Sequence, residues 1–155
     1  MCNLRLSGEI PESVVDGIGI RYTIFFQGCD IHCYKCHNPQ TWDFNGGYLK
    51  SVKDVIKDVQ NTPLATGVTF TGGEALLQTQ ALLELSTSLK ALGYNLWLYS
   101  GRKVEVLERN PEYLKVLKVV DTLVDGAYVH KLRTFSLPFR GSSNQRIIDL
   151  RHRYG

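Results

Sequence analysis

Short runs of β-branched and aromatic residues recur along this chain with helical stretches between them, and this alternation limits its fold more than any other feature. Four runs fit buried strands: residues 20–27, 67–71, 95–99 and 119–124. Strands that alternate with helices form parallel sheets with helical crossovers. The sequence therefore predicts an α/β fold with a mostly parallel sheet.

Helical patterns fill the intervals between the predicted strands. Ser51 suits an N-cap, and the residues after it are apolar at the helical period: Val52, Val55, Ile56 and Val59. A longer helix is expected over residues 76–92, where leucines form one stripe and Gly93 ends the pattern. Two short helices should follow, the second beginning at Asn110-Pro111. Residues 146–150 fit one more extended segment.

The length of 155 residues suits one domain spanning residues 1–155, large enough to bury a core without disulfides. No apolar run reaches the roughly 18 residues of a membrane helix. The first ten residues lack the apolar centre of a secretory signal, so a cytoplasmic protein is expected.

Unusual motifs follow each predicted strand. Three cysteines follow the first strand, Gly72-Gly73-Glu74 the second, Ser100-Gly101 the third and Asp125-Gly126 the fourth. Parallel sheets place their ligands at the carboxyl ends of the strands, so these motifs are expected to share one site.

The cysteines have the spacing Cys29-x3-Cys33-x2-Cys36. Three thiolates this close can hold one [4Fe–4S] cluster and leave its fourth iron open for a substrate or cofactor. A structural zinc site would need a fourth ligand, for which His32 and His37 are the nearby candidates. A redox pair would use Cys33 and Cys36 alone. The open cluster is the favoured interpretation, because no second CxxC pair completes a zinc site, His37 directly follows Cys36, and a redox pair would leave Cys29 idle.

Positive charge is concentrated near the C-terminus. Residues 126–155 hold six Lys or Arg against Asp149 alone, a balance of +5. Such a segment favours either a solvated face or an acidic partner. Arg140 and Arg146, with the polar run Ser142, Ser143, Asn144 and Gln145, are the candidate docking edge or ligand contacts.

The cysteine spacing after a first strand is the signature of the radical S-adenosylmethionine superfamily. The segments DGIGIR (residues 16–21) and TGGEALLQ (71–78) resemble the glycyl-radical-enzyme activases. The segment FRGSSNQRIID (139–149) is similar to the activating proteins of anaerobic ribonucleoside-triphosphate reductase. That resemblance runs from about Asp16 to Leu150. Pyruvate formate-lyase activases resemble the first half but are longer chains.

The resemblance implies a small partial (β/α) barrel and an oxidoreductase with two cofactors, a [4Fe–4S] cluster and S-adenosylmethionine. Cys29, Cys33 and Cys36 would be the metal ligands. S-adenosylmethionine would lie against Lys35, Cys36, His37, Gly72, Gly73, Glu74 and Ser100. Reductive cleavage would give a 5′-deoxyadenosyl radical that takes hydrogen from a partner glycine, with no side-chain acid or base.

The implied partners are the large subunit of anaerobic ribonucleoside-triphosphate reductase and a low-potential electron donor, without nucleic acid or membrane. Two positions depart from the family. Lys35 stands where an aromatic residue often precedes the third cysteine, and Ile18 replaces a proline. Four alternatives remain: an activase of another glycyl radical enzyme, a radical enzyme acting on a small molecule, a non-catalytic zinc-binding module and a dithiol redox protein.

Overall fold

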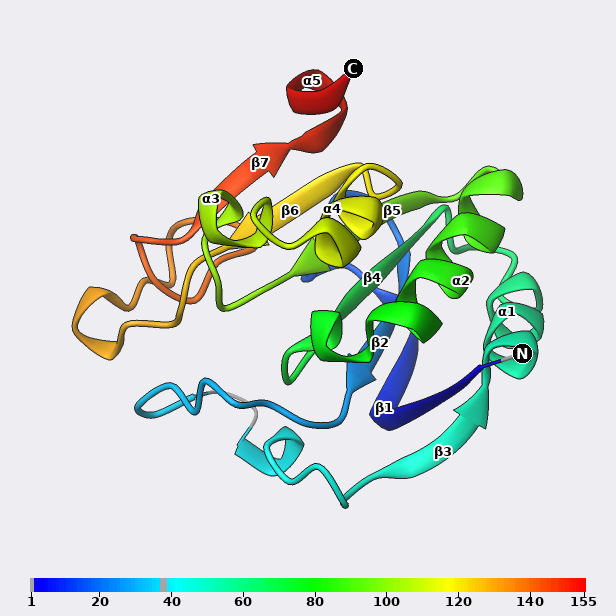
Figure 1. Cartoon of the computed structure of the whole chain (residues 1–155), viewed down its shortest axis with the longest axis horizontal. Helices are drawn as coiled ribbons and strands as arrows, with labels where there is room; N and C mark the ends of the chain where they lie inside the picture. The colour runs from blue at the N-terminus through cyan, green and yellow to red at the C-terminus, as the bar shows by residue number, and fades with distance from the viewer. Residues whose placement is uncertain (1, 37–38) are drawn as a thin grey trace.

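The computed structural model describes residues 2–36 and 39–155, and its framework is one sheet with the strand order β3-β1-β2-β4-β5-β6-β7 (Figure 1). The strands are β1 (Asn3–Ser13), β2 (Arg21–Phe26), β3 (Tyr48–Ser51), β4 (Gly67–Gly72), β5 (Asn95–Tyr99), β6 (Thr122–Asp125) and β7 (Arg146–Asp149). The helices are α1 (Val52–Gln60), α2 (Thr79–Ala91), α3 (Val104–Leu107), α4 (Pro111–Leu117) and α5 (Leu150–Tyr154). Three short 3-10 turns complete it: Pro39–Thr41, Ala75–Gln78 and His130–Leu132.

The sheet is mixed. Its centre is parallel, since β2, β4, β5 and β6 pair in that order. The flanking pairs β1–β2, β1–β3 and β6–β7 are antiparallel. The expected α/β class is confirmed. A mostly parallel sheet was expected, but the sheet is parallel only at its centre. The reason is that β1 is joined to β2 by the short loop 14–20, which is too short for a parallel crossover.

One face of the sheet carries the core. Figure 1 shows α1, α2 and α4 on the same side of the strands. Alternate strand residues point toward them and are buried with the leucines of α2: Ile24, Phe26, Val68, Phe70, Leu96, Leu98, Leu82, Leu85 and Leu89. Ser51 accepts a hydrogen bond from Asp54 N, as expected for the N-cap of α1. None of the helices formed by the described residues is long and apolar enough to cross a membrane.

The intervening strand residues point to the opposite face, which holds a buried cation. The Arg21 guanidinium donates to Thr69 Oγ1 (2.7 Å) and to the carbonyl oxygens of Ile18 (2.9 Å), Val68 (3.0 Å) and Asn95 (2.9 Å). It also lies 5.6 Å from the centre of the Trp97 ring. Burial lowers the pKa of Arg21 to about 10, which leaves it charged at neutral pH. Arg21 thus ties the loop 14–20 to two central strands.

Candidate cluster and cofactor site

The cysteine loop begins where β2 ends, and the segment after it holds it in place. Gly28 N donates to Thr41 O (2.5 Å), and the Gln27 side chain donates to Gln40 O (3.0 Å) and Asp43 O (2.7 Å). A side chain at Gly28, whose φ is +106°, would collide with Phe44 at 2.7 Å. Residues 28–36 are therefore folded back against residues 39–44.

The three cysteines of this loop line one cavity of about 570 Å³. None of the three forms a disulfide among the described residues; Cys29 is buried, and Cys33 and Cys36 are partly exposed. Burial raises the pKa of Cys33; a backbone hydrogen bond from Tyr128 lowers it, and the nearby Cys36 and Cys29 raise it. All three cysteines come from one short loop and line one cavity, which suits a cluster whose irons share the charge of three thiolates.

No zinc site is complete among the described residues. No group of three or more His, Cys, Asp or Glu among residues 2–36 and 39–155 is placed to hold one metal ion. A zinc site needs its ligands around one point, whereas a [4Fe–4S] cluster takes each thiolate on a different iron. Three cysteines are the donor set of a cluster with one open iron. His37, one of the two zinc candidates, lies outside the described residues.

The glycine pair at the end of β4 lines the same cavity. Gly73 N donates to Phe26 O and Glu74 N donates to Gly28 O, both at 2.9 Å. Gly72 has a φ of +103°, and a Cβ there would lie 2.4 Å from Phe26 N. A Cβ at Gly73 would lie 2.4 Å from Gly28 O. Both glycines are required because the end of β4 packs directly on the backbone that enters the cysteine loop.

Glu74 is the buried carboxyl group of the cavity, with 1% of its surface exposed. Its Oε2 accepts from Gly101 N (2.9 Å), while its Oε1 has no hydrogen-bond partner among the described residues. Burial raises the pKa of Glu74, against the opposing effects of Gly101 N–H, Ser100 and Arg102. A buried acceptor without a donor is costly, so the site fits a ligand that brings an N–H group.

The other predicted cofactor residues divide into two groups. Ser100 lines the cavity and accepts from Arg102 N (3.1 Å), whereas Lys35 is exposed and does not belong to the cavity wall. Lys35 has a φ of +54°, and its ammonium lies 5.7 Å from the centre of the Tyr34 ring. His37 was also predicted to contact the cofactor and lies outside the described residues.

Arg102 is a site residue that the sequence reading missed. Its Nη2 donates to Asp30 in the cysteine loop (2.5 Å), and its Nη1 lies 3.5 Å from Glu74 Oε2. Arg102 therefore joins the two walls of the cavity. Its place directly after Ser100-Gly101 at a strand end was a signal that could have found it.

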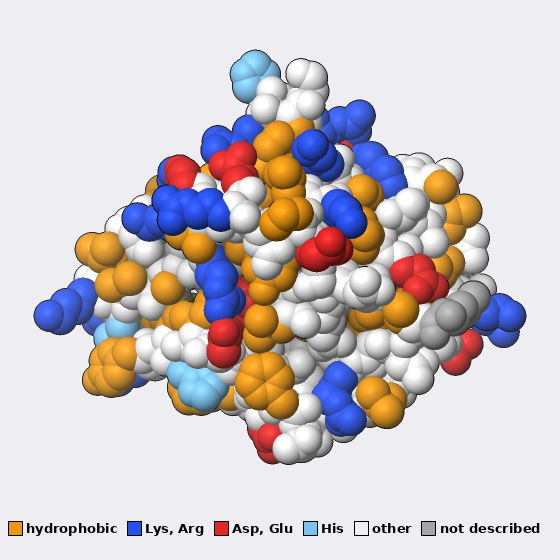
Figure 2. All heavy atoms as spheres, viewed as in Figure 1, with side chains coloured by type: hydrophobic (Ala, Val, Ile, Leu, Met, Phe, Trp, Pro, Cys, Tyr) orange, Lys and Arg blue, Asp and Glu red, His pale blue; other side chains and the backbone are white. Residues whose placement is uncertain are grey.

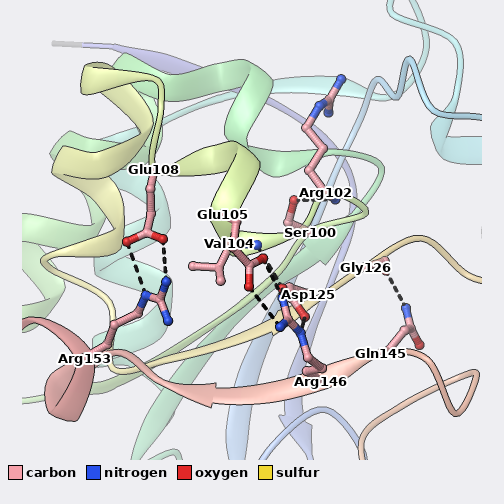
Figure 3. Close-up of polar contacts among 10 residues, drawn as sticks. All are labelled: Ser100, Arg102, Val104, Glu105, Glu108, Asp125, Gly126, Gln145, Arg146 and Arg153. Atoms are coloured by element: carbon pink, nitrogen blue, oxygen red, sulfur yellow. Dashed lines mark hydrogen bonds and ion pairs between the residues drawn. The ribbon is translucent and has the colours of Figure 1, made fainter.

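Arg146 has a different environment from the one expected of a docking residue. Figure 3 shows its guanidinium between Glu105 and Asp125. It donates to Asp125 Oδ1 (3.0 Å) and to both Glu105 oxygens (3.0 and 2.8 Å), and Asp125 also accepts from Val104 N (2.8 Å). These ion pairs hold β7 against α3 and β6, so Arg146 anchors the C-terminal segment.

Comparisons with known proteins agree with this site. The family model of a "4Fe-4S single cluster domain" matches residues 15–148. The "Anaerobic ribonucleoside-triphosphate reductase-activating protein" of Escherichia coli (strain K12) is 34% identical over 149 residues, which cover 91% of this chain and 96% of that protein. The "Pyruvate formate-lyase-activating enzyme" of Listeria monocytogenes serovar 1/2a is also 34% identical, but the match covers only 62% of that longer protein.

A solved structure extends the likeness to the fold. QueE from Escherichia coli superposes with a TM-score of 0.52 at 19% identity, over 64% of this chain and 52% of that one. The expected cofactors, a [4Fe–4S] cluster and S-adenosylmethionine, agree with these matches. The family model covers most of the chain, and the full-length match extends over nearly the whole of the reductase-activating relative. The chain therefore belongs to the 4Fe–4S single cluster domain family and, within it, to the anaerobic ribonucleoside-triphosphate reductase-activating proteins.

Proposed function

We propose that this protein activates an anaerobic ribonucleoside-triphosphate reductase by reductive cleavage of S-adenosylmethionine. The observation that carries the proposal is one cavity lined by three cysteines, the glycine pair of β4 and the buried carboxylate of Glu74, which has one oxygen without a partner among the described residues. Its volume of about 570 Å³ lies within the range of small-molecule sites. When bound, the cluster supplies the electron that breaks the S–C5′ bond and so yields the 5′-deoxyadenosyl radical.

The chain's own residues bind and orient the two cofactors and shield them from water. Cys29, Cys33 and Cys36 would hold the cluster and would leave one iron without a protein ligand. Gly72 and Gly73 leave room for the methionyl part of S-adenosylmethionine against the backbone, and Glu74 Oε1 accepts from its ammonium group. Ser100 lies on the same wall. Burial of this wall keeps water from the reacting atoms and strengthens the ammonium–carboxylate contact.

The open sheet suits a protein substrate. Its edge strands β3 and β7 are not paired with each other among the described residues. We infer that the seven strands serve as an open, partial barrel in one domain, with the gap admitting a backbone segment of the reductase. Cysteines that form no disulfide among the described residues, together with a cluster, favour a reducing compartment, for which we propose the cytoplasm.

Electron paramagnetic resonance tests this function directly. We expect the anaerobically reconstituted, reduced protein to give a [4Fe–4S]⁺ signal that changes shape when S-adenosylmethionine is added. The same sample should produce 5′-deoxyadenosine and a glycyl radical on the reductase large subunit. A radical on pyruvate formate-lyase instead would assign the chain to the other activase class. A cluster that is indifferent to S-adenosylmethionine would contradict the proposal.

Glu74→Gln should weaken S-adenosylmethionine binding without unfolding the protein. Glutamine keeps the shape and can still accept from Gly101 N, but it lacks the charge that faces the ammonium group. A charge-assisted hydrogen bond contributes about 1.5–3 kcal/mol, so we expect KM for S-adenosylmethionine to rise about 10- to 100-fold. Steady-state formation of 5′-deoxyadenosine measures it. Glu112→Gln, at an exposed position of α4, is the matched control and should leave KM unchanged.

A further inference from the structure

Exposed apolar side chains lie in the cavity wall and beside it. Val15 comes from the loop 14–20, and Leu132, Phe135 and Leu137 come from one later segment. Tyr34 of the cysteine loop meets that segment, since its ring lies 5.9 Å from the His130 ring. We call the five residues Val15, Tyr34, Leu132, Phe135 and Leu137 the rim. Val15, Phe135 and Leu137 reach the cavity itself, and 96% of the Phe135 surface is exposed. Apolar side chains this exposed and this close together indicate a contact surface.

The segment that carries Phe135 is held over the cavity by its own contacts. Thr134 N donates to Gly141 O (3.1 Å), and Arg133 forms a bridge with Ser142, so the two arms of the loop are paired. Phe139 packs edge-on against Trp97 at 5.2 Å, and its carbonyl accepts from Tyr99 OH (2.8 Å). Phe135 is therefore presented from a paired loop that is fixed to the sheet.

The base of this loop is fastened by three consecutive side chains. Asn144 donates to Ala127 O (2.8 Å), Gln145 to Gly126 O (3.0 Å) and Arg146 to Asp125. Each side chain thus binds one of three consecutive residues, the last of β6 and the two after it; the last two contacts are drawn in Figure 3. Gln145 Oε1 also accepts from Gly141 N (2.9 Å). Such anchoring lowers the entropy that the loop would lose on contact with a partner.

The same surface is also positively charged. Residues 126–148 contain Lys131, Arg133, Arg140 and Arg146 and no Asp or Glu. Among the described residues, an acidic side chain pairs with Arg146 but not with the other three. Figure 2 shows hydrophobic and basic side chains together at the end of the molecule where this loop projects in Figure 1. An apolar surface with unpaired cations is complementary to an apolar and acidic one.

We propose that the rim, with Lys131 and Arg133, is the docking surface for the reductase large subunit. The inference rests on the proposed function, since the partner's glycine must enter the cavity past the rim. The occupant is a segment of the reductase that passes through the mouth and places apolar side chains on the rim and carboxylates beside the cations. Phe135 is the central apolar contact.

The test compares rim variants with matched controls as the concentration of the reductase is varied. Phe135→Ser should raise the half-saturating concentration of reductase for glycyl-radical formation at least about tenfold, because buried aromatic anchors dominate such interfaces. Arg133→Glu should raise it about fivefold or more and make docking less sensitive to salt. The controls are Leu64→Ser and Lys53→Glu, exposed residues away from the rim, and both should stay within about twofold of the parent.

Cleavage of S-adenosylmethionine by the parent protein without reductase separates the two conclusions. If the parent cleaves it but Phe135→Ser and Arg133→Glu activate the reductase as well as the parent, the docking surface is wrong and the proposed function stands. If the parent neither cleaves S-adenosylmethionine nor forms a glycyl radical, both fail. Should Phe135→Ser lose its cluster, Arg133→Glu, at an exposed position, decides alone.

Discussion

We expect Cys33→Ala to abolish S-adenosylmethionine cleavage and to leave the protein without a stable [4Fe–4S] cluster. The cavity offers three thiols among its lining residues, and a cluster that already has one iron without a protein ligand would keep only two. Loss of groups that merely support a metal ligand costs 10- to 100-fold in metal affinity or activity, so loss of a ligand should cost at least about a hundredfold. Iron and sulfide content and 5′-deoxyadenosine formation measure the result.

Two further cysteine variants make this prediction specific. Cys29→Ala should have the same effect as Cys33→Ala, whereas a dithiol redox protein would need only Cys33 and Cys36. Cys2→Ala should keep its cluster, because Cys2 is partly buried against the apolar core, away from the lining of the cavity. Full activity of Cys29→Ala, or zinc in place of iron and sulfide, would contradict the cluster assignment.

We expect Arg21→Leu to lower the free energy of unfolding by about 3 kcal/mol or more. The substitution removes four hydrogen bonds that the buried guanidinium donates, three of them to the carbonyl oxygens of Ile18, Val68 and Asn95. A hydrogen bond from a charged group contributes about 1.5–3 kcal/mol. The guanidinium also packs closely on Gly67, where a Cβ would lie 2.5 Å from Nη1, so the shorter leucine leaves that contact empty. Urea denaturation followed by circular dichroism gives the difference.

Arg109→Leu is the matched control for this prediction, because Arg109 is exposed and should change stability by less than about 0.5 kcal/mol. Arg21→Lys tests the role of charge alone. Lysine keeps the positive charge, but its single ammonium group cannot reach all four acceptors that the branched guanidinium binds. We therefore expect a loss of stability between those of the other two variants. If Arg21→Leu matched the control, the hydrogen bonds at this position would contribute little to stability.

The centre of the fold was predictable from sequence, and its edges were not. Residues 20–27, 67–71 and 95–99 became β2, β4 and β5, because continuous β-branched runs are typical of strands buried on both faces. The strand expected at 119 starts at Thr122, since Val119 and Val120 are still bonded to Val116 at the exit of α4. β1 was not predicted, because it contains Gly8 and Pro11 and its pairing with β2 is interrupted by register shifts. An edge strand depends on its neighbours for pairing, which a local pattern does not reveal.

The candidate site was likewise predictable where it lies on the central strands and not where it depends on distant partners. The cysteine loop, Gly72-Gly73-Glu74 and Ser100 come together because the central strands are parallel and end at one edge. Arg102 and Arg146 were missed or misread, because the carboxylates that define their roles lie 21 to 72 residues away in the chain. A cation that looks free in sequence acquires its role only when the fold supplies its partner.

The hydrogen bonds from Gly73 N to Phe26 O and from Glu74 N to Gly28 O make the two walls of the cavity one mechanical unit. A displacement of the cysteine loop is therefore transmitted to the wall proposed for S-adenosylmethionine. Thermodynamic linkage makes the effect reciprocal: whatever factor the cluster contributes to the affinity for S-adenosylmethionine, S-adenosylmethionine contributes to retention of the cluster. In a cell short of S-adenosylmethionine, this protein would then lose its cluster iron more readily.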